Sequence, residues 1–173
     1  MQPNAEVEVR VATVDDAAAI ATVHVRSWQS GYAGIVPASY LDALDPETAT
    51  ERWRQWLAAG PADDVVTWVV TSGSKVVGFA SVGPARDEDA RRSEREVYSI
   101  YLVPEAWGFG AARELMRTVI NEIGEDAPLS LWVVADSARA RQFYRRHGFS
   151  PDGVEEIRER GGVDLTEVRY RRS

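Results

Sequence analysis

The chain has 173 residues, of which 45% are hydrophobic and 27% charged, as is typical of a globular domain and not of a disordered segment. It contains no cysteine, so disulfides, thiolate metal ligands and a cysteine nucleophile are excluded. Its net charge of −7 is opposite to that of most nucleic-acid-binding proteins and weakly favours a cationic partner such as an amine.

The N-terminal sequence MQPNAEVEVR contains acidic residues and no apolar core, unlike a signal peptide. No apolar stretch approaches the roughly 20 residues that a membrane-spanning helix needs. We therefore expect a cytoplasmic protein that binds neither membrane nor nucleic acid. No repeat or linker divides the sequence, so we expect a single domain over residues 1–173.

The first sixty residues predict one strand and two helices. Residues 7–11 alternate between apolar and charged side chains, which indicates a half-buried strand. A helix should begin at Thr13 and run to about Ser27. Residues 28–44 contain two glycines and a proline, so we expect this segment to be broken or only locally helical. A second helix should follow Pro46 and stop at Gly60-Pro61, with an inner face of Trp53, Trp56 and Leu57.

The middle of the chain predicts three strands. Residues 65–71 and 75–82 flank Ser72-Gly73-Ser74, a pattern typical of a hairpin. The polar run 85–92 should be a solvated loop. Residues 94–103 alternate again and should form a strand that ends before Pro104.

The remaining elements complete an α+β order. Residues 111–123 predict a helix that buries Leu115, Met116, Val119 and Ile120 and ends at Gly124. A buried strand over 129–134, a helix over 137–147 and two terminal strands joined around residues 159–162 follow. An antiparallel meander followed by one β-α-β crossover predicts an α+β sheet and not a Rossmann repeat.

The segment Trp107-Gly108-Phe109-Gly110-Ala111-Ala112 lies between a strand and a helix. Its glycines permit positive φ, and the free N–H groups at a helix N-terminus attract phosphate. The residues alone leave two interpretations open, an anion-binding turn and a purely structural one. Arg113 stands where a dinucleotide-binding G-x-G-x-x-G motif needs its third glycine.

Two motifs together resemble the GCN5-related N-acetyltransferase (GNAT) family. Trp107-x-x-Gly110-x-Ala112 is similar to the family's cofactor motif Gln/Arg-x-x-Gly-x-Gly/Ala. ADSARARQFYRRHGF is similar to its C-terminal motif, and SWQSGYAGIVP fits as well. The resemblance spans the chain and implies a mixed, mostly antiparallel sheet of six to seven strands, flanked by about four helices. This sheet would splay into a V where the strands ending at Val103 and starting near Leu129 part.

The resemblance also implies acetyl-CoA as cosubstrate. Backbone groups of Leu102 and Val103 would pair with the pantetheine arm, and a backbone N–H near Val103 would polarise the thioester carbonyl. The pyrophosphate would be held by the backbone N–H groups of the glycine loop, from Gly108, Phe109, Gly110, Ala111 and Ala112. Ser137 stands where many members have Asn, and Trp107 replaces the usual Gln or Arg.

Acyl transfer to an amine needs a neutral nitrogen, and an alkyl amine of pKa about 10.4 is only about one part in a few thousand neutral at pH 7. The resemblance assigns a general base to Glu96, which shares a strand face with Glu94 and Tyr98. A solvent-facing carboxylate is the alternative. It assigns protonation of the thiolate to Tyr144, for which aromatic packing beside Phe143 is the alternative.

The acceptor site implied by the resemblance includes Trp28, Tyr32 and Tyr98. Two distant histidines and no cysteine predict no metal site. We expect an N-acyltransferase that moves an acetyl group from acetyl-CoA to a small amine or a protein amine in a ternary complex. A non-catalytic acyl-CoA-binding module and a dinucleotide-binding oxidoreductase remain as alternatives. The terminal strands could pair in a homodimer.

Overall fold

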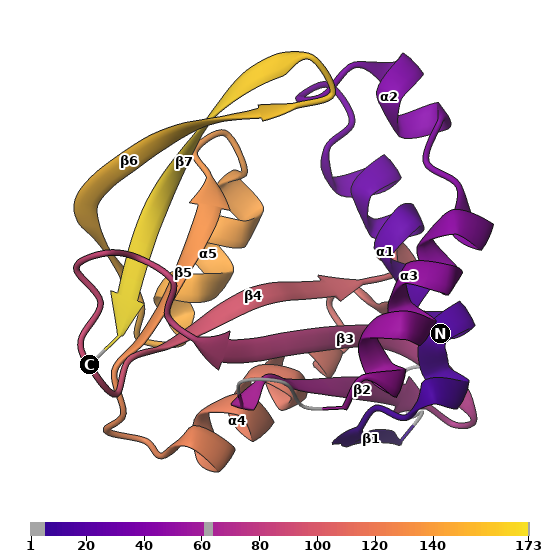
Figure 1. The fold of residues 1–173 in the computed structure, drawn as a ribbon, viewed down its shortest axis with the longest axis horizontal. Helices are drawn as coiled ribbons and strands as arrows, with labels where there is room; N and C mark the ends of the chain where they lie inside the picture. The colour runs from indigo at the N-terminus through magenta and orange to yellow at the C-terminus, as the bar shows by residue number, and fades with distance from the viewer. Residues whose placement is uncertain (1–5, 61–63, 173) are drawn as a thin grey trace.

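The computed structural model describes residues 6–60 and 64–172, which form one sheet covered by helices (Figure 1). The first five residues and Pro61, on which two expectations depend, lie outside the described residues. The sheet has seven strands in the order β1-β2-β3-β4-β5-β7-β6. Their bounds are β1 Val7–Val11, β2 Val66–Ser72, β3 Lys75–Pro84, β4 Arg95–Leu102, β5 Leu129–Val134, β6 Ser150–Arg160 and β7 Val163–Arg172.

The described residues contain five α-helices, against about four expected. They are α1 Ala17–Gly31, α2 Ala38–Asp42, α3 Pro46–Ala58, α4 Ala111–Ile123 and α5 Ala138–Arg146, and short 3-10 turns stand at Val14–Asp16 (η1) and Pro104–Ala106 (η3). α4 packs against β1 to β4, whereas α1 packs against β3 and β4 and carries α3. Figure 1 shows α4 on one face of the sheet and α1 with α3 on the other.

The core face predicted for α4 is confirmed. Leu115, Met116, Val119 and Ile120 are all buried, and the helix ends at Gly124, whose φ is +97°. Burying four large apolar side chains stabilises the fold by about 1.5–3 kcal/mol each. This packing fixes where the N-terminus of α4 lies relative to β4.

Two expectations for the N-terminal helices are wrong. α1 does not stop near Ser27 but continues through Trp28 to Gly31, because that last turn packs its aromatic side chain against the sheet end. Trp56 does not belong to the inner face of α3, since 49% of its surface is exposed, while Trp53 and Leu57 do pack against the core.

The sheet splays between β4 and β5, the one parallel pair in the described sheet. Pairing covers only Arg95↔Leu129, Glu96↔Ser130 and Val97↔Leu131. Beyond these residues, β4 runs on to Leu102 along β3 and β5 runs on to Val134 along β7. The expected V-shaped, mostly antiparallel sheet is therefore confirmed.

The C-terminal hairpin of β6 and β7 arches over β4 toward the N-terminal helices (Figure 1). β7 lies between β5 and β6, so β6 is an edge strand, and most of its residues are exposed. At the tip, a Cβ on Gly161 would lie 2.5 Å from Cγ of Tyr40 in α2. This close approach requires glycine at position 161. It brings the tip of the C-terminal hairpin into contact with α2.

Candidate active site

Two cavities meet where β4 and β5 part. The helix-side cavity, of about 250 Å³, lies between β4, β5 and α5 and reaches the loop before α4. The hairpin-side cavity, of about 280 Å³, lies between β4, α1 and the β6–β7 hairpin. Both are lined by Tyr32, Val97, Tyr98, Tyr101 and Trp132, so a molecule in one reaches a molecule in the other at these residues.

The glycine loop has the geometry that its sequence predicts. Gly108 and Gly110 have φ of +81° and +85°, and Gly110 caps α4 without a side-chain hydrogen bond. A Cβ added at either glycine would meet no atom within 4 Å. The N–H groups of the first helical turn therefore face open space, the arrangement that suits a bound phosphate. Ala112 also lines the helix-side cavity.

Trp107 has a structural role. Its indole N–H donates to the carbonyl oxygen of Leu102 at 3.2 Å, and the guanidinium of Arg139 stacks over its ring at 3.7 Å from the centroid. Arg139 forms no ion pair with a described residue, and burial lowers its pKa. A cation without an acidic partner thus lies beside the glycine loop, on the wall of the helix-side cavity.

Val103 does not have the free backbone groups expected of it. Its N–H donates to the carbonyl of Val77 at 2.9 Å, and its carbonyl accepts from Ala106 at 3.0 Å. Val103 therefore has no free N–H for the pantetheine arm or for the thioester carbonyl. Leu102 is the residue whose carbonyl turns to the splay, as strand alternation requires, and it lines the helix-side cavity.

The other residues expected around the loop lie in different environments. Ser137 caps α5 without a side-chain hydrogen bond and lines the helix-side cavity. Phe109 is 44% exposed at the loop tip, and Ala111 is buried beneath it. The side chain of Ala111 is therefore not available to a ligand.

Three tyrosine hydroxyls converge where the cavities meet. Burial raises the pKa of Tyr144, and Tyr101 adds to the effect. Burial likewise raises the pKa of Tyr32, and Tyr101 and Tyr144 raise it further. The phenols therefore keep their protons at neutral pH and are available as hydrogen-bond donors. The ring of Tyr144 also packs edge-on against Phe143. Aromatic packing therefore accounts for the ring of Tyr144 but gives no role to its hydroxyl.

Trp28 stacks on Tyr32 with ring centroids 4.4 Å apart and lines the hairpin-side cavity. Its indole interacts with Tyr101 and partly offsets the burial that raises the pKa of that phenol. No acceptor among the described residues lies within hydrogen-bond geometry of its buried indole nitrogen.

Glu96 is buried, so the alternative of a solvent-facing strand carboxylate is wrong. Its side chain is only 3% exposed and forms an ion pair with Arg86, whose backbone N–H donates to it as well. It lines the hairpin-side cavity one residue before the strands part. Glu94, expected on the same face, is instead bound by Arg171 at 3.0 Å.

The hydroxyl of Tyr98 is already used in a hydrogen bond. Its hydroxyl donates to the carbonyl of Pro84 at 2.6 Å, and the guanidinium of Arg86 lies 4.0 Å above its ring. The ring borders both cavities, where it forms part of the wall.

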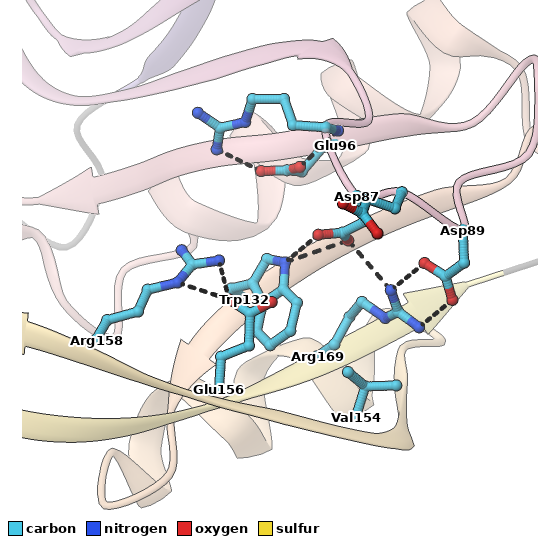
Figure 2. Close-up of a pocket in the computed structure, with 10 residues that line it drawn as sticks. Asp87, Asp89, Glu96, Trp132, Val154, Glu156, Arg158 and Arg169 are labelled. Atoms are coloured by element: carbon cyan, nitrogen blue, oxygen red, sulfur yellow. Dashed lines mark hydrogen bonds and ion pairs between the residues drawn. The ribbon is translucent and has the colours of Figure 1, made fainter.

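A larger outer cavity, of about 620 Å³, continues from the hairpin-side cavity between the 85–94 loop and the hairpin (Figure 2). Arg169 forks onto Asp89 at 2.6 and 2.8 Å and also binds Asp152 at 2.6 Å. Asp87 accepts from the indole of Trp132 at 3.2 Å. The loop expected to be merely solvated is thus fastened to β7 by ion pairs and to β5 by a hydrogen bond.

Several residues at this junction were not found from the sequence. Tyr101, Trp132, Arg160 and Glu167 come from β4 to β7 and meet only because of the sheet order. Strict alternation along β4 would put Tyr101 and Glu96 on opposite faces of the sheet, but the register shift between β3 and β4 after Val97 brings both to the hairpin-side cavity. Glu167 lies in β7, whose sequence pattern predicts a strand but gives no indication that this residue lines a cavity.

Within residues 6–60 and 64–172, no group of three or more His, Asp or Glu side chains could hold a metal ion. None of the helices described there is both long and apolar enough to cross a bilayer.

Comparisons with known proteins agree with this geometry. The sequence profile described as the acetyltransferase (GNAT) family matches residues 23–149. An uncharacterized N-acetyltransferase of Bacillus subtilis, YuaI, is 34% identical over 164 residues, covering 94% of this chain and 90% of its own. A probable N-acetyltransferase of Mycobacterium tuberculosis is 24% identical over 99% of this chain and 95% of its own.

Solved structures share the fold. A ribosomal-protein-alanine N-acetyltransferase from Brucella melitensis superposes with a TM-score of 0.76 at 25% identity, covering 95% of this chain and 98% of its own. The PaiA N-acetyltransferase from Thermoplasma acidophilum, in complex with coenzyme A, gives 0.73 at 18% identity over 96% and 98% of the two chains.

Proposed function

The chain belongs to the acetyltransferase (GNAT) family and is an acyl-CoA-dependent N-acetyltransferase, and we propose that it transfers an acetyl group from acetyl-CoA to a primary amine by direct attack in a ternary complex. The observation that carries this mechanism is the pair of cavities that meet at shared tyrosines. Donor and acceptor can then be bound at once, which a direct attack requires.

Family membership also decides between the alternatives. The oxidoreductase is wrong, because the matched family is an acetyltransferase family and the sheet is an antiparallel meander with one parallel pair. The non-catalytic binding module gains no support, because the relatives bear the names of N-acetyltransferases.

Acetyl-CoA would occupy the helix-side cavity. The loop N–H groups from Gly108 to Ala112 would hold the pyrophosphate, because the space above both glycines is open. Arg139, stacked on Trp107, would supply the cationic side chain that the loop itself lacks. The bound coenzyme A in the Thermoplasma structure of the same fold supports this cosubstrate. Ser137 lies on the wall of the same cavity.

The reaction needs two proton movements. The amine nitrogen attacks the thioester carbon, the C–S bond breaks, and the amine loses a proton. Glu96 would accept that proton through water from the hairpin-side cavity, and Tyr144 would donate its hydroxyl proton to the departing thiolate. A desolvated cavity raises the pKa of the departing thiol. The thiolate therefore accepts a proton more readily, which favours the transfer from Tyr144.

The test uses the purified chain and a panel of amines. Acetyl-CoA should raise the melting temperature, and thiol release should require an amine and yield a product heavier by one acetyl group. Acetyl-CoA binding with no amine consumed across protein, peptide and small-molecule acceptors would refute the proposed transfer.

A further inference from the structure

The hairpin-side cavity has an unusual charge for an acidic protein. Its charged walls are three arginines, Arg86, Arg158 and Arg160, and two glutamates, Glu96 and Glu167. The difference leaves one net positive charge in the cavity, although the chain as a whole carries −7. An acceptor site for a simple alkyl ammonium should have the opposite sign.

The two glutamates are neutralised and set back from the cavity. Glu96 pairs with Arg86, and Glu167 pairs with Arg158 at 3.1 Å and with Arg160 at 3.6 Å. The glutamate side chains are 3% and 9% exposed, whereas the three arginines are 61%, 32% and 39% exposed. Guanidinium groups are therefore the charges that a ligand in this cavity meets.

The three arginines differ in how many of their donors are occupied. Arg158 binds Glu156 and Glu167 and lies over the Trp132 ring at 4.8 Å. Arg86 binds Glu96 and stacks on Tyr98. Arg160 has only the 3.6 Å contact with Glu167 and donates no side-chain hydrogen bond to another described residue.

Arg160 lies close to the junction of the cavities. Its positive charge acts on the buried hydroxyl of Tyr101, one of the residues that both cavities share. A planar guanidinium with free N–H groups binds a carboxylate by two parallel hydrogen bonds. A group bound there would lie in the same cavity as Tyr101, which also borders the helix-side cavity.

We infer that the acceptor carries a carboxylate close to its amine, as an α-amino acid does, and that Arg160 binds this carboxylate with Arg86 beside it. The inference rests on the proposed function and narrows its acceptor from amines in general to amines that bear a carboxylate. The guanidinium groups also favour the neutral form of a nearby amine, the form that attacks. The negative charge of the whole chain thus does not describe the acceptor site.

The test compares matched acceptors with the full chain and saturating acetyl-CoA. Each set contains an α-amino acid, its carboxamide and the amine left after decarboxylation. We expect kcat/KM for the amino acid to exceed that of the other two at least about tenfold, the factor of one charge-assisted hydrogen bond. The carboxamide has the more acidic ammonium, so the intrinsic reactivity of its amine opposes this preference.

Variants assign the effect to a residue. Arg160→Gln should reduce kcat/KM for the amino acid much more than for its carboxamide, so that the ratio of the two falls to about one. Arg160→Lys should restore part of the preference. Arg54→Gln is the matched control, because Arg54 is an exposed arginine of α3 that pairs only with Glu51.

Other outcomes overturn the inference. Equal or faster turnover of the decarboxylated amines would refute it and leave the proposed function standing. A preference for succinyl-CoA over acetyl-CoA that Arg160→Gln abolishes would show that the arginine reads the acyl donor, which also refutes it. If no acceptor of any set released thiol, the inference would fall, and the panel of protein, peptide and small-molecule amines would then decide the proposed function.

Discussion

The helix-side and hairpin-side cavities share a wall of tyrosines but differ in what makes them. Most residues that line the helix-side cavity come from one continuous stretch of chain, from β4 through the glycine loop and β5 to α5, and the end of α1 completes the wall. The hairpin-side cavity joins α1 to strands more than a hundred residues away and is held by ion pairs such as Glu167 with Arg158. In the proposed function, local backbone geometry forms the cavity for acetyl-CoA, the cosubstrate common to the family. Long-range ion pairs shape the cavity for the acceptor.

The largest expected effect concerns Tyr144, which lines the helix-side cavity beside the shared tyrosines. Tyr144→Phe should lower kcat by about 10²- to 10³-fold, the contribution of a general acid, and leave the Kd for acetyl-CoA unchanged. Calorimetry and steady-state kinetics measure the two quantities. Tyr40→Phe, which removes a hydroxyl outside both cavities, should change neither. An unchanged kcat in Tyr144→Phe would assign the hydroxyl to packing.

Glu96 tests the hairpin side. Glu96→Gln should lower kcat/KM about 10²-fold at pH 7, and the deficit should shrink as the pH approaches about 10, where a much larger fraction of the amine is neutral. The pH–rate profiles of the variant and of the unaltered chain give this comparison. Glu94→Gln removes a buried carboxylate nearby that lines neither cavity and should keep the normal profile. A deficit that is constant with pH would make Glu96 a positioning residue for Arg86.

Gly110 tests the helix side. Gly110→Ala should weaken acetyl-CoA binding at least about tenfold, or ~1.4 kcal/mol, because the new Cβ enters the space left for the phosphate. It should also destabilise the fold by about 1–2 kcal/mol, the cost of positive φ. Gly73→Ala places a Cβ at another positive-φ glycine, in the β2–β3 hairpin. It should match the loss of stability and spare the Kd.

Arg139 sharpens the cofactor side further. Arg139→Ala should weaken acetyl-CoA binding about fivefold, in the range of an exposed charge contact. Binding of S-acetylpantetheine, which has no phosphates, should be unaffected. Arg146→Ala on the same helix is the control. Equal losses for both ligands would mean that Arg139 acts by supporting Trp107.

The smallest effect concerns the ion pairs behind the hairpin side. The hydrogen bond from Arg169 lowers the pKa of Asp89 from 3.8 to about 2. A lowered folded-state pKa adds stability that is present above the unfolded pKa and lost as the pH falls through the folded one. Melting temperatures between pH 4 and pH 2 should therefore decline less steeply in Asp89→Asn than in the unaltered chain. Asp126→Asn, on the turn between α4 and β5, should leave the slope unchanged.

The sequence was sufficient for the fold because its main signals are local. The apolar stripe of α4 and the positive φ of Gly108 and Gly110 follow from residue types and spacing. The alternation of residues 94–103 and the apolar run 129–134 predicted the bounds of β4 and β5 to within one residue. The family resemblance predicted the splay between them.

The acceptor side could not be predicted in the same way. The ion pair of Glu96 with Arg86 and the junction of Tyr32 with Tyr101 depend on register and on strand order, which no short window of sequence contains. Trp107 shows the same limit. Its departure from the motif was visible, but its bond to the Leu102 carbonyl and the stacked Arg139 were not.

The position of β7 between β5 and β6 has a consequence for how the enzyme is made. Ribosomes deliver β6 before β7, so β6 has no partner strand until the last residues emerge. During that interval it is a free edge, and its charged residues, including Glu155, Glu156 and Arg158, oppose pairing with other chains. Arg160 and Glu167 also arrive at this late stage. Acceptor recognition is therefore acquired later in synthesis than the glycine loop of the cofactor side.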